Sequence, residues 1–273
     1  MALKQNARAI SSRWIGHRGT SLVATAFRRW REFSFGPGDI GASQSDESAL
    51  IANLVEGLAI PHTFCEFGFH VAEFNCGKLV RGGWEGLLID GDEQRVRMAR
   101  NVVARDPALR VEVKQLFLTT ANLAPTIRGY LGERALGVLS VDVDGNDYWF
   151  LRELLPLRPY VIIVEYNGSF GLRPITVPYD PAFERHAKHP SGWYHGASIS
   201  AFHGLCTQHG YSLIGTSQDG LNLFFIRADV APDGTKQLVP SEAYRENQLR
   251  NRWSGTSADQ QWQVLHDLPF VEV

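Results

Sequence analysis

The sequence predicts an α/β protein with a doubly wound, mostly parallel sheet of seven strands that ends in an antiparallel hairpin. The first observation is a pair of apolar runs, residues 137–141 and 160–164, that stop at acids. Unbroken runs rich in Val and Ile suit strands buried on both faces. The second observation is the segment between these runs, residues 148–157, which is long enough for a helix and would complete a β-α-β unit. The third is the same alternation from residue 63 onward.

The elements before this unit follow from local signals. Asp46 and Glu47 near the start of the first helix favour its N-terminus, and Pro107 stops a clear amphipathic pattern. Helices are expected at residues 43–58, 72–80 and 93–106 and within 119–131, and strands at 63–67, 84–89 and 110–117.

The chain beyond the unit is less regular. Residues 168–196 are rich in Pro, His and aromatic residues, which indicates a lid or binding loop, or else a surface excursion without a role. A helix is expected at 197–209, followed by a hairpin at 211–227 around the turn Asp219-Gly220. The tail, residues 229–273, has helical pieces and an apolar end that we expect to dock on the domain.

Three segments are therefore expected: a basic helical N-terminal extension at residues 1–42, an α/β domain at 43–228 that includes the lid, and the tail. Seven of the 27 Lys and Arg residues lie in residues 1–31, where there is no acid. This start resembles a mitochondrial transit peptide. The alternative is a basic extension packed on an acidic domain.

Composition excludes several classes of protein. The net charge of −2 favours no particular partner, and no specific nucleic-acid binding is expected because the chain beyond residue 31 is acidic. Three cysteines without a CxxC spacing fit a reducing compartment, so a cytoplasmic protein is expected. There is no apolar stretch of the ~18 residues that span a bilayer. A homodimer is left open.

Acids and amides follow the strands at residues 137–141 and 160–164. Because ligands of open parallel sheets bind at the carboxyl ends of the strands, these side chains are expected to converge there. A divalent cation, direct capture of substrate hydroxyls, or capping of the next helix would each explain them. The side chains are Asp142, Asp144, Asn146, Asp147, Glu165 and Asn167.

Four motifs carry a family resemblance over roughly residues 61–228. They read CEFG, GLLIDGD, SVDVDGNDYW and VIIVEYN. Together with the strand order, they resemble class I S-adenosylmethionine-dependent methyltransferases, in particular the FkbM-like group. The resemblance implies a Rossmann-like methyltransferase fold, S-adenosylmethionine as cofactor, and methyl transfer to a hydroxyl of a small molecule, sugar or glycan.

The resemblance also implies the site. His70 stands where the family's first motif has a further glycine, so its side chain must point away or take part. Asp142 and Asp144 are catalytic candidates, and His70 and His195 are candidate bases, with His186 and His189 behind them. A Mg²⁺ ion, if present, is expected on Asp144, Glu165 and Asn167. The residues expected at the cofactor are Glu66, Gly68, Phe69, Asp90, Asp92, Phe117, Thr119 and Asp142.

Three other functions are alternatives. A catalytically degenerate domain that binds a partner is favoured by His70 in the first motif. A nicotinamide-dependent oxidoreductase lacks the G-x-G-x-x-G fingerprint after the first strand. Methylation of nucleic acid would use the basic N-terminus, but the remaining chain is acidic.

Overall fold

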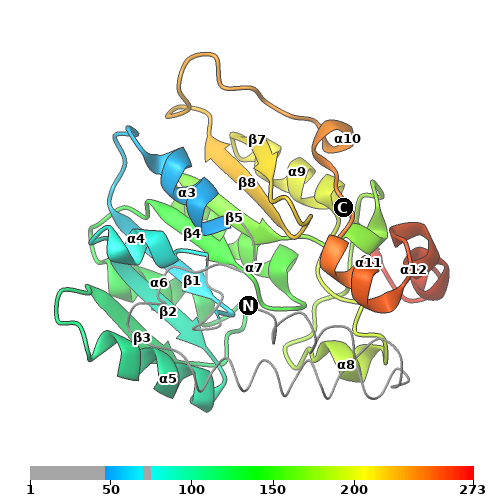
Figure 1. The fold of residues 1–273 in the computed structure, drawn as a ribbon, viewed down its shortest axis with the longest axis horizontal. Helices are drawn as coiled ribbons and strands as arrows, with labels where there is room; N and C mark the ends of the chain where they lie inside the picture. Colours follow the sequence, from blue (N-terminus) through cyan, green and yellow to red (C-terminus); the bar gives the residue numbers. More distant parts are fainter. Residues whose placement is uncertain (1–46, 70–74) are drawn as a thin grey trace, which may run out of the picture. The chain divides into compact units, whose positions relative to one another are not determined.

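The computed structural model describes residues 47–69 and 75–273 (Figure 1). All of the described residues belong to one compact unit, Ile40–Val273. The predicted extension at residues 1–42 and the candidate base His70 lie outside the described residues.

Seven strands form one sheet in the order β3-β2-β1-β4-β5-β8-β7. The first five are mutually parallel, and β8 runs antiparallel to both of its neighbours. The strand order reverses direction between β1 and β4, which makes their carboxyl ends the switch point where ligands bind in such sheets. The predicted doubly wound sheet with its C-terminal hairpin is confirmed, and its topology is that of the Rossmann-like methyltransferase fold. The strands are β1 (Thr63–Phe67), β2 (Glu85–Asp90), β3 (Val111–Gln115), β4 (Val138–Val141), β5 (Val161–Glu165), β7 (Tyr211–Thr216) and β8 (Asn222–Arg227).

The central strands are buried along their whole length, as their unbroken apolar sequences predict. Every residue of β1, β4 and β5 is buried, which requires cover on both faces of the sheet. In the edge strand β3 only Val113 is buried, and the charged Glu112 is exposed. A charge on an edge strand discourages pairing with another chain.

Helices flank the sheet (Figure 1). Side-chain caps mark two of their N-termini: Asp92 accepts a hydrogen bond from the Arg95 N–H at the start of α5, and Ser198 accepts one from the Ala201 N–H at the start of α9. None of the described helices has the length and apolar character needed to cross a bilayer. The helices are α3 (Glu47–Val55), α4 (Gly77–Arg81), α5 (Glu93–Val103), α6 (Leu123–Leu131), α7 (Asp147–Leu154), which continues into η2 (Leu155–Leu157), and α9 (Ile199–Gln208).

The segment at residues 168–196, here called the lid, contains more structure than its sequence predicts. Its strand β6 pairs with β9 at the end of the tail, and Phe170 of the lid packs with Leu265 of the tail in a small separate core. The tail therefore contacts the lid through both a strand pair and this core. The lid elements are η3 (Gly168–Phe170), β6 (Ile175–Thr176) and α8 (Arg185–Lys188), and those of the tail are α10 (Pro240–Ala243), α11 (Gln248–Ser254), α12 (Ala258–Leu265) and β9 (Val271–Glu272).

The register aligns the carboxyl ends of the parallel strands. Phe67 of β1 lies opposite Ile89 of β2 and Val141 of β4, and Val141 lies opposite Val164 of β5. Neighbouring strands lie about 4.8 Å apart. The residues that follow β2 and β4 are therefore roughly 10 Å apart, with the end of β1 between them.

Candidate functional site

The turn after β1 requires glycine at position 68. Gly68 has φ +75°, and a Cβ atom there would lie 1.3 Å from the carbonyl oxygen of Asp142. Its N–H donates to the carbonyl oxygen of Ile89 at 3.3 Å. The turn thus contacts the ends of both β2 and β4. Because Gly68 has no side chain, the backbone of this turn is accessible to a ligand that binds at the switch point.

Glu66 organises this turn from inside the protein. Its two carboxylate oxygens accept hydrogen bonds from the backbone N–H groups of Asn75 and Cys76, each at 2.8 Å. Burial raises the pKa of Glu66, and the two N–H groups oppose that shift. Phe69 is also buried. Both predicted cofactor residues therefore shape the turn, and the oxygens of Glu66 are already engaged.

Asp90 ends β2 and is nearly buried, with 8% of its surface exposed. One carboxylate oxygen accepts the N–H of Asp92 at 2.7 Å, while the other has a 3.3 Å contact with the Arg95 guanidinium. The Asp92 carboxylate caps α5. Of the two acids in this motif, Asp90 is the one with an oxygen available for a ribose hydroxyl, because its second contact is long and partly exposed.

An exposed aromatic ring lies beside Asp90. Phe117, in the loop after β3, has 61% of its surface exposed, and a Cβ atom on Gly91 would lie 3.1 Å from its ring. The loop is fixed by Asn122, whose side chain accepts the N–H of Thr119 at 2.8 Å and donates to the carbonyl oxygen of Phe117 at 3.0 Å. Phe117 therefore offers a flat face for a base, and Thr119 holds the loop.

Two of the polar residues after β4 serve the local structure. Asp147 is fully buried, and its oxygens accept the N–H groups of Val143 at 2.7 Å and Gly145 at 2.9 Å. Asn146 exchanges hydrogen bonds with the backbone of Asp180 in the lid. Asp147 therefore ties the loop before α7 and does not cap the helix, which has no side-chain cap. It supports the loop on which Asp144 adopts a left-handed backbone, with φ +56°.

Asn167 is a clamp between β5, the lid and the tail. Its amide nitrogen donates to the carbonyl oxygens of Trp193 at 2.6 Å and His195 at 2.8 Å. Its oxygen accepts from the N–H of Ser169 and from the Arg250 guanidinium. Both lone pairs of that oxygen are used, so Asn167 has no free oxygen for the predicted metal ion in this arrangement.

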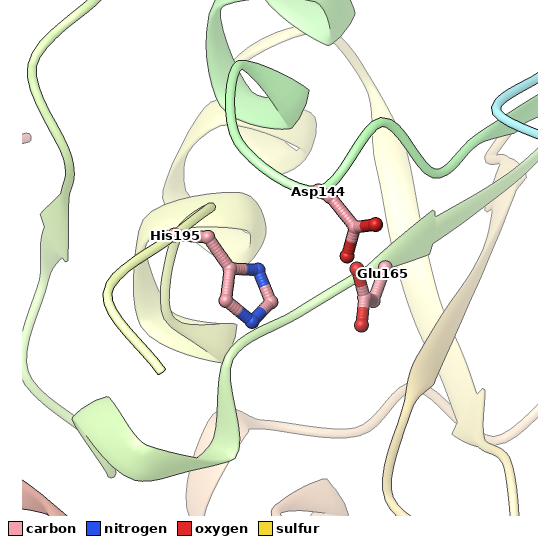
Figure 2. Close-up of side chains that lie close together, drawn as sticks. All are labelled: Asp144, Glu165 and His195. Carbon is pink, nitrogen blue, oxygen red and sulfur yellow. The ribbon is translucent and has the colours of Figure 1, made fainter. Parts of the chain in front are cut away.

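Asp142, Asp144, Glu165 and His195 lie close together. The ligand atoms of Asp144, Glu165 and His195 lie within 4.8 Å of one another, and so do those of Asp142, Asp147 and Glu165. Figure 2 shows the carboxylates of Asp144 and Glu165 pointing toward each other, with the imidazole of His195 facing them. We call Asp142, Asp144 and Glu165 the acid cluster.

Two carboxyl groups of the acid cluster have raised pKa values. Burial and the carboxylates of Asp144 and Asp147 raise the pKa of Glu165 to about 8, against the opposing effect of Arg185 and Arg250. Burial and the neighbouring Glu165 raise the pKa of Asp142 well above its usual value. Among the described residues, Glu165 Oε2 has no hydrogen-bond partner although it is buried. Asp142 and Glu165 therefore form a coupled pair that can exchange a proton.

The lid covers this edge of the sheet. The phenol oxygen of Tyr179 accepts the N–H of Thr120 at 3.2 Å, and the ring of Phe183 lies against Gly145. Arg185 of α8 forms an ion pair with Asp144. The lid thus links the loops after β3 and β4, and no pattern in the sequence marks Arg185 as part of the site.

The histidines differ in their surroundings. His195 is buried and its Nε2 lies 2.8 Å from Nη2 of Arg250, while burial and the charges of Arg185 and Arg250 hold its pKa well below 6.5. In the lid, His186 lies against Gly192 and His189 Nδ1 pairs with the Ser191 hydroxyl at 2.7 Å. Of the described histidines, His195 is the one that lies with the acid cluster.

No family model and no curated protein sequence matches the chain. Several solved structures are similar to it. WbdD, described as a bifunctional kinase-methyltransferase, matches at 16% identity and TM-score 0.46, over 74% of this chain and 45% of WbdD. The N-terminal domain of EvdMO1, solved with SAH and D-fucose, matches at 14% identity and TM-score 0.44, over 68% of this chain and 84% of that domain. Magnesium protoporphyrin IX methyltransferase (ChlM) from Synechocystis PCC 6803, with bound SAH, matches at 16% identity and TM-score 0.45, over 76% of this chain and 99% of ChlM. At these identities and TM-scores, none of the three assigns an activity to this chain.

Proposed function

We propose that the protein is an S-adenosylmethionine-dependent methyltransferase that methylates a hydroxyl group of a small molecule, sugar or glycan. Membership of the FkbM-like group is part of this proposal. One observation carries it: the bare Gly68 turn lies between Asp90 with the exposed Phe117 on one side and the acid cluster on the other. The strand spacing puts Asp90 and Asp142 roughly 10 Å apart, a span suited to a nucleoside with a short attached chain.

The residues present fit the cofactor. A Cβ atom at position 68 would collide with the Asp142 carbonyl oxygen, so glycine is needed for the turn after β1 to meet the end of β4. Asp90 can accept ribose hydroxyls, and the exposed face of Phe117 can stack on a base. Bound S-adenosylmethionine would supply a methyl group on a positively charged sulfur.

The acid cluster would serve the acceptor. A hydroxyl is a weak nucleophile and must lose its proton as it takes the methyl group. Glu165 has a pKa of about 8 and a buried oxygen with no partner among the described residues, so its ionised form can take that proton and predominates above about pH 8. Asp144 at the rim can orient the acceptor. A buried carboxyl group with a raised pKa, at the edge of the sheet where ligands bind, favours an enzyme over a degenerate binding domain.

Replacing Asp90 or Phe117 with alanine is expected to weaken binding of S-adenosylhomocysteine by about tenfold or more. A charge-assisted hydrogen bond and a base–aromatic stack each contribute about 1–3 kcal/mol, and 1.4 kcal/mol corresponds to a tenfold change in Kd. Isothermal titration calorimetry measures the effect. The exposed Asp233→Ala and Trp253→Ala are matched controls that should bind as the wild type does. Equal affinity in all five proteins would refute the assigned cofactor site.

Assistance by a Mg²⁺ ion is a second candidate. It is favoured by the partnerless Glu165 Oε2 beside Asp144, because hard cations bind carboxylate oxygens. Asp142, Asp144 and Glu165 would hold the ion and Asn167 would not. Arg185 would have to release Asp144.

If a metal ion assists, EDTA-treated protein will lose methyl transfer and regain it on addition of Mg²⁺, with Asp144→Asn raising the Mg²⁺ concentration required. Initial rates with a hydroxylated acceptor panel, in EDTA and at increasing Mg²⁺, measure this. Full activity in EDTA would leave the acid cluster acting without a metal ion.

The degenerate-domain alternative is distinguished by turnover. It predicts S-adenosylhomocysteine binding without methyl transfer to any acceptor, whereas the proposed function predicts labelled product from methyl-labelled cofactor. The oxidoreductase alternative predicts a thermal shift with NAD(H) in place of one with S-adenosylhomocysteine.

A further inference from the structure

Arg250 is a buried guanidinium that reaches the site from the C-terminal tail. It lies on α11 and has 9% of its surface exposed. Its Nη1 donates to the Asn167 amide oxygen at 2.6 Å and to the Ser169 hydroxyl at 2.7 Å. Its Nη2 lies 2.8 Å from His195 Nε2. Burial lowers the pKa of Arg250 to about 10, so the guanidinium is still charged at pH 7.

The contact with Arg250 sets the tautomer of His195. An arginine side chain has donors and no acceptor, so the His195 nitrogen that it contacts must present a lone pair. Nε2 therefore carries no proton, and a neutral ring then carries its proton on Nδ1. In Figure 2 the nitrogen next to the Cβ-bearing ring carbon, Nδ1, lies on the side of the ring toward Asp144. His195 thus turns an N–H toward the acid cluster.

The same contact removes His195 as a base. Its one basic nitrogen already accepts a hydrogen bond from a cation, and protonating it would create a second positive charge against Arg250 in a buried place. Arg185 and His186 add positive charge nearby, while the carboxylates of Asp144 and Glu165 face the ring. The predicted role of His195 as general base does not fit this geometry.

We infer that Arg250 is a positioning residue that fixes His195 as a hydrogen-bond donor toward the acid cluster, so that His195 is not the general base of the site. Its part in methyl transfer rests on the proposed function.

The wild-type protein tests the inference directly. Long-range ¹H–¹⁵N correlation spectra of ¹⁵N-histidine-labelled protein distinguish the two tautomers and the charged ring, and His195→Asn assigns the signals. We expect His195 as the Nδ1–H tautomer, unchanged between about pH 5 and pH 8, across the range where ordinary histidines titrate. An Nε2–H ring, or one that titrates near pH 6.5, would overturn the inference. The spectrum needs no cofactor or acceptor, so it decides this point whether or not methyl transfer is found.

Variants of Arg250 separate positioning from general structural support. Arg250→Met removes the donor, and we expect His195 then to titrate or to populate the Nε2–H form. Arg250→Lys keeps a donor and should restore the Nδ1–H form at least in part. Arg252→Met, on the exposed side of the same helix, should leave the spectrum unchanged. A wild-type tautomer in Arg250→Met would contradict the assigned role, and if that variant fails to fold the wild-type spectrum still decides.

Discussion

Replacing Glu165 with glutamine is expected to lower kcat for methyl transfer by about 100- to 10,000-fold, the range typical of loss of a general base. Glutamine keeps the shape of the side chain but cannot accept a proton at neutral pH. The affinity for S-adenosylhomocysteine should be unchanged, because Glu165 lies at the end of β5 while Gly68, Asp90 and Phe117 lie at the ends of β1, β2 and β3. Initial rates with saturating cofactor, combined with calorimetry, measure both quantities.

The assignment of Glu165 as the base also predicts how the rate of methyl transfer changes with pH. A general base works when deprotonated, so wild-type kcat/KM should rise with pH and level off above about 8, where burial and nearby carboxylates set the pKa of Glu165. The observed value belongs to the coupled pair with Asp142. The exposed Glu133→Gln is the matched control and should keep the wild-type rate and profile. Wild-type turnover in Glu165→Gln would refute the assigned base.

Substitution of Gly68 with alanine is expected to abolish binding of S-adenosylhomocysteine and to reduce the free energy of unfolding by at least about 2 kcal/mol. A Cβ atom would lie 1.3 Å from a backbone carbonyl oxygen, so the ends of β1 and β4 must separate, and φ of +75° adds strain. Urea unfolding and calorimetry measure the two effects.

Gly234→Ala isolates the backbone contribution. Gly234 has φ +79° and nothing within 4 Å of its hypothetical Cβ atom. It carries the strain without the clash, so its cost should be smaller and cofactor binding should be retained. If both variants lose the same stability and both bind S-adenosylhomocysteine, the tight contact of Gly68 with Asp142 has no role in the site.

The sheet could be predicted because each strand is marked by its own local sequence. The bounds of β1 agree with the predicted range, 63–67, and those of the other strands differ by one or two residues. Buried strands of Val, Ile and Phe need no distant partner to be recognised, and the turn at Asp219-Gly220 marks the hairpin. The gathering of Asp142, Asp144 and Glu165 followed from the strand order alone.

The use of each polar side chain could not be predicted in the same way. A structural acid and a ligand-binding acid can both stand just after a strand. The sequence therefore cannot separate Asp92, which caps α5, and Asp147, which ties the loop before α7, from Asp90 and Glu165. Only the positions of the backbone N–H groups make the distinction.

Contacts between distant segments were missed for a related reason. β6 exists because β9 pairs with it from the end of the chain. Arg185 and Arg250 are ordinary basic residues in their helices, and they become part of the site only when the lid and the tail fold onto the sheet. No local residue spacing in the sequence predicts contacts between such distant segments.

A crystal structure of the protein with S-adenosylhomocysteine tests the central claim most directly. We predict the adenine on Phe117, the ribose hydroxyls on Asp90, and the sulfur over the Gly68 turn, facing Glu165. Ligand density at any other face of the sheet, or no binding at saturating concentration, would contradict the assignment of this edge as a methyl-transfer site.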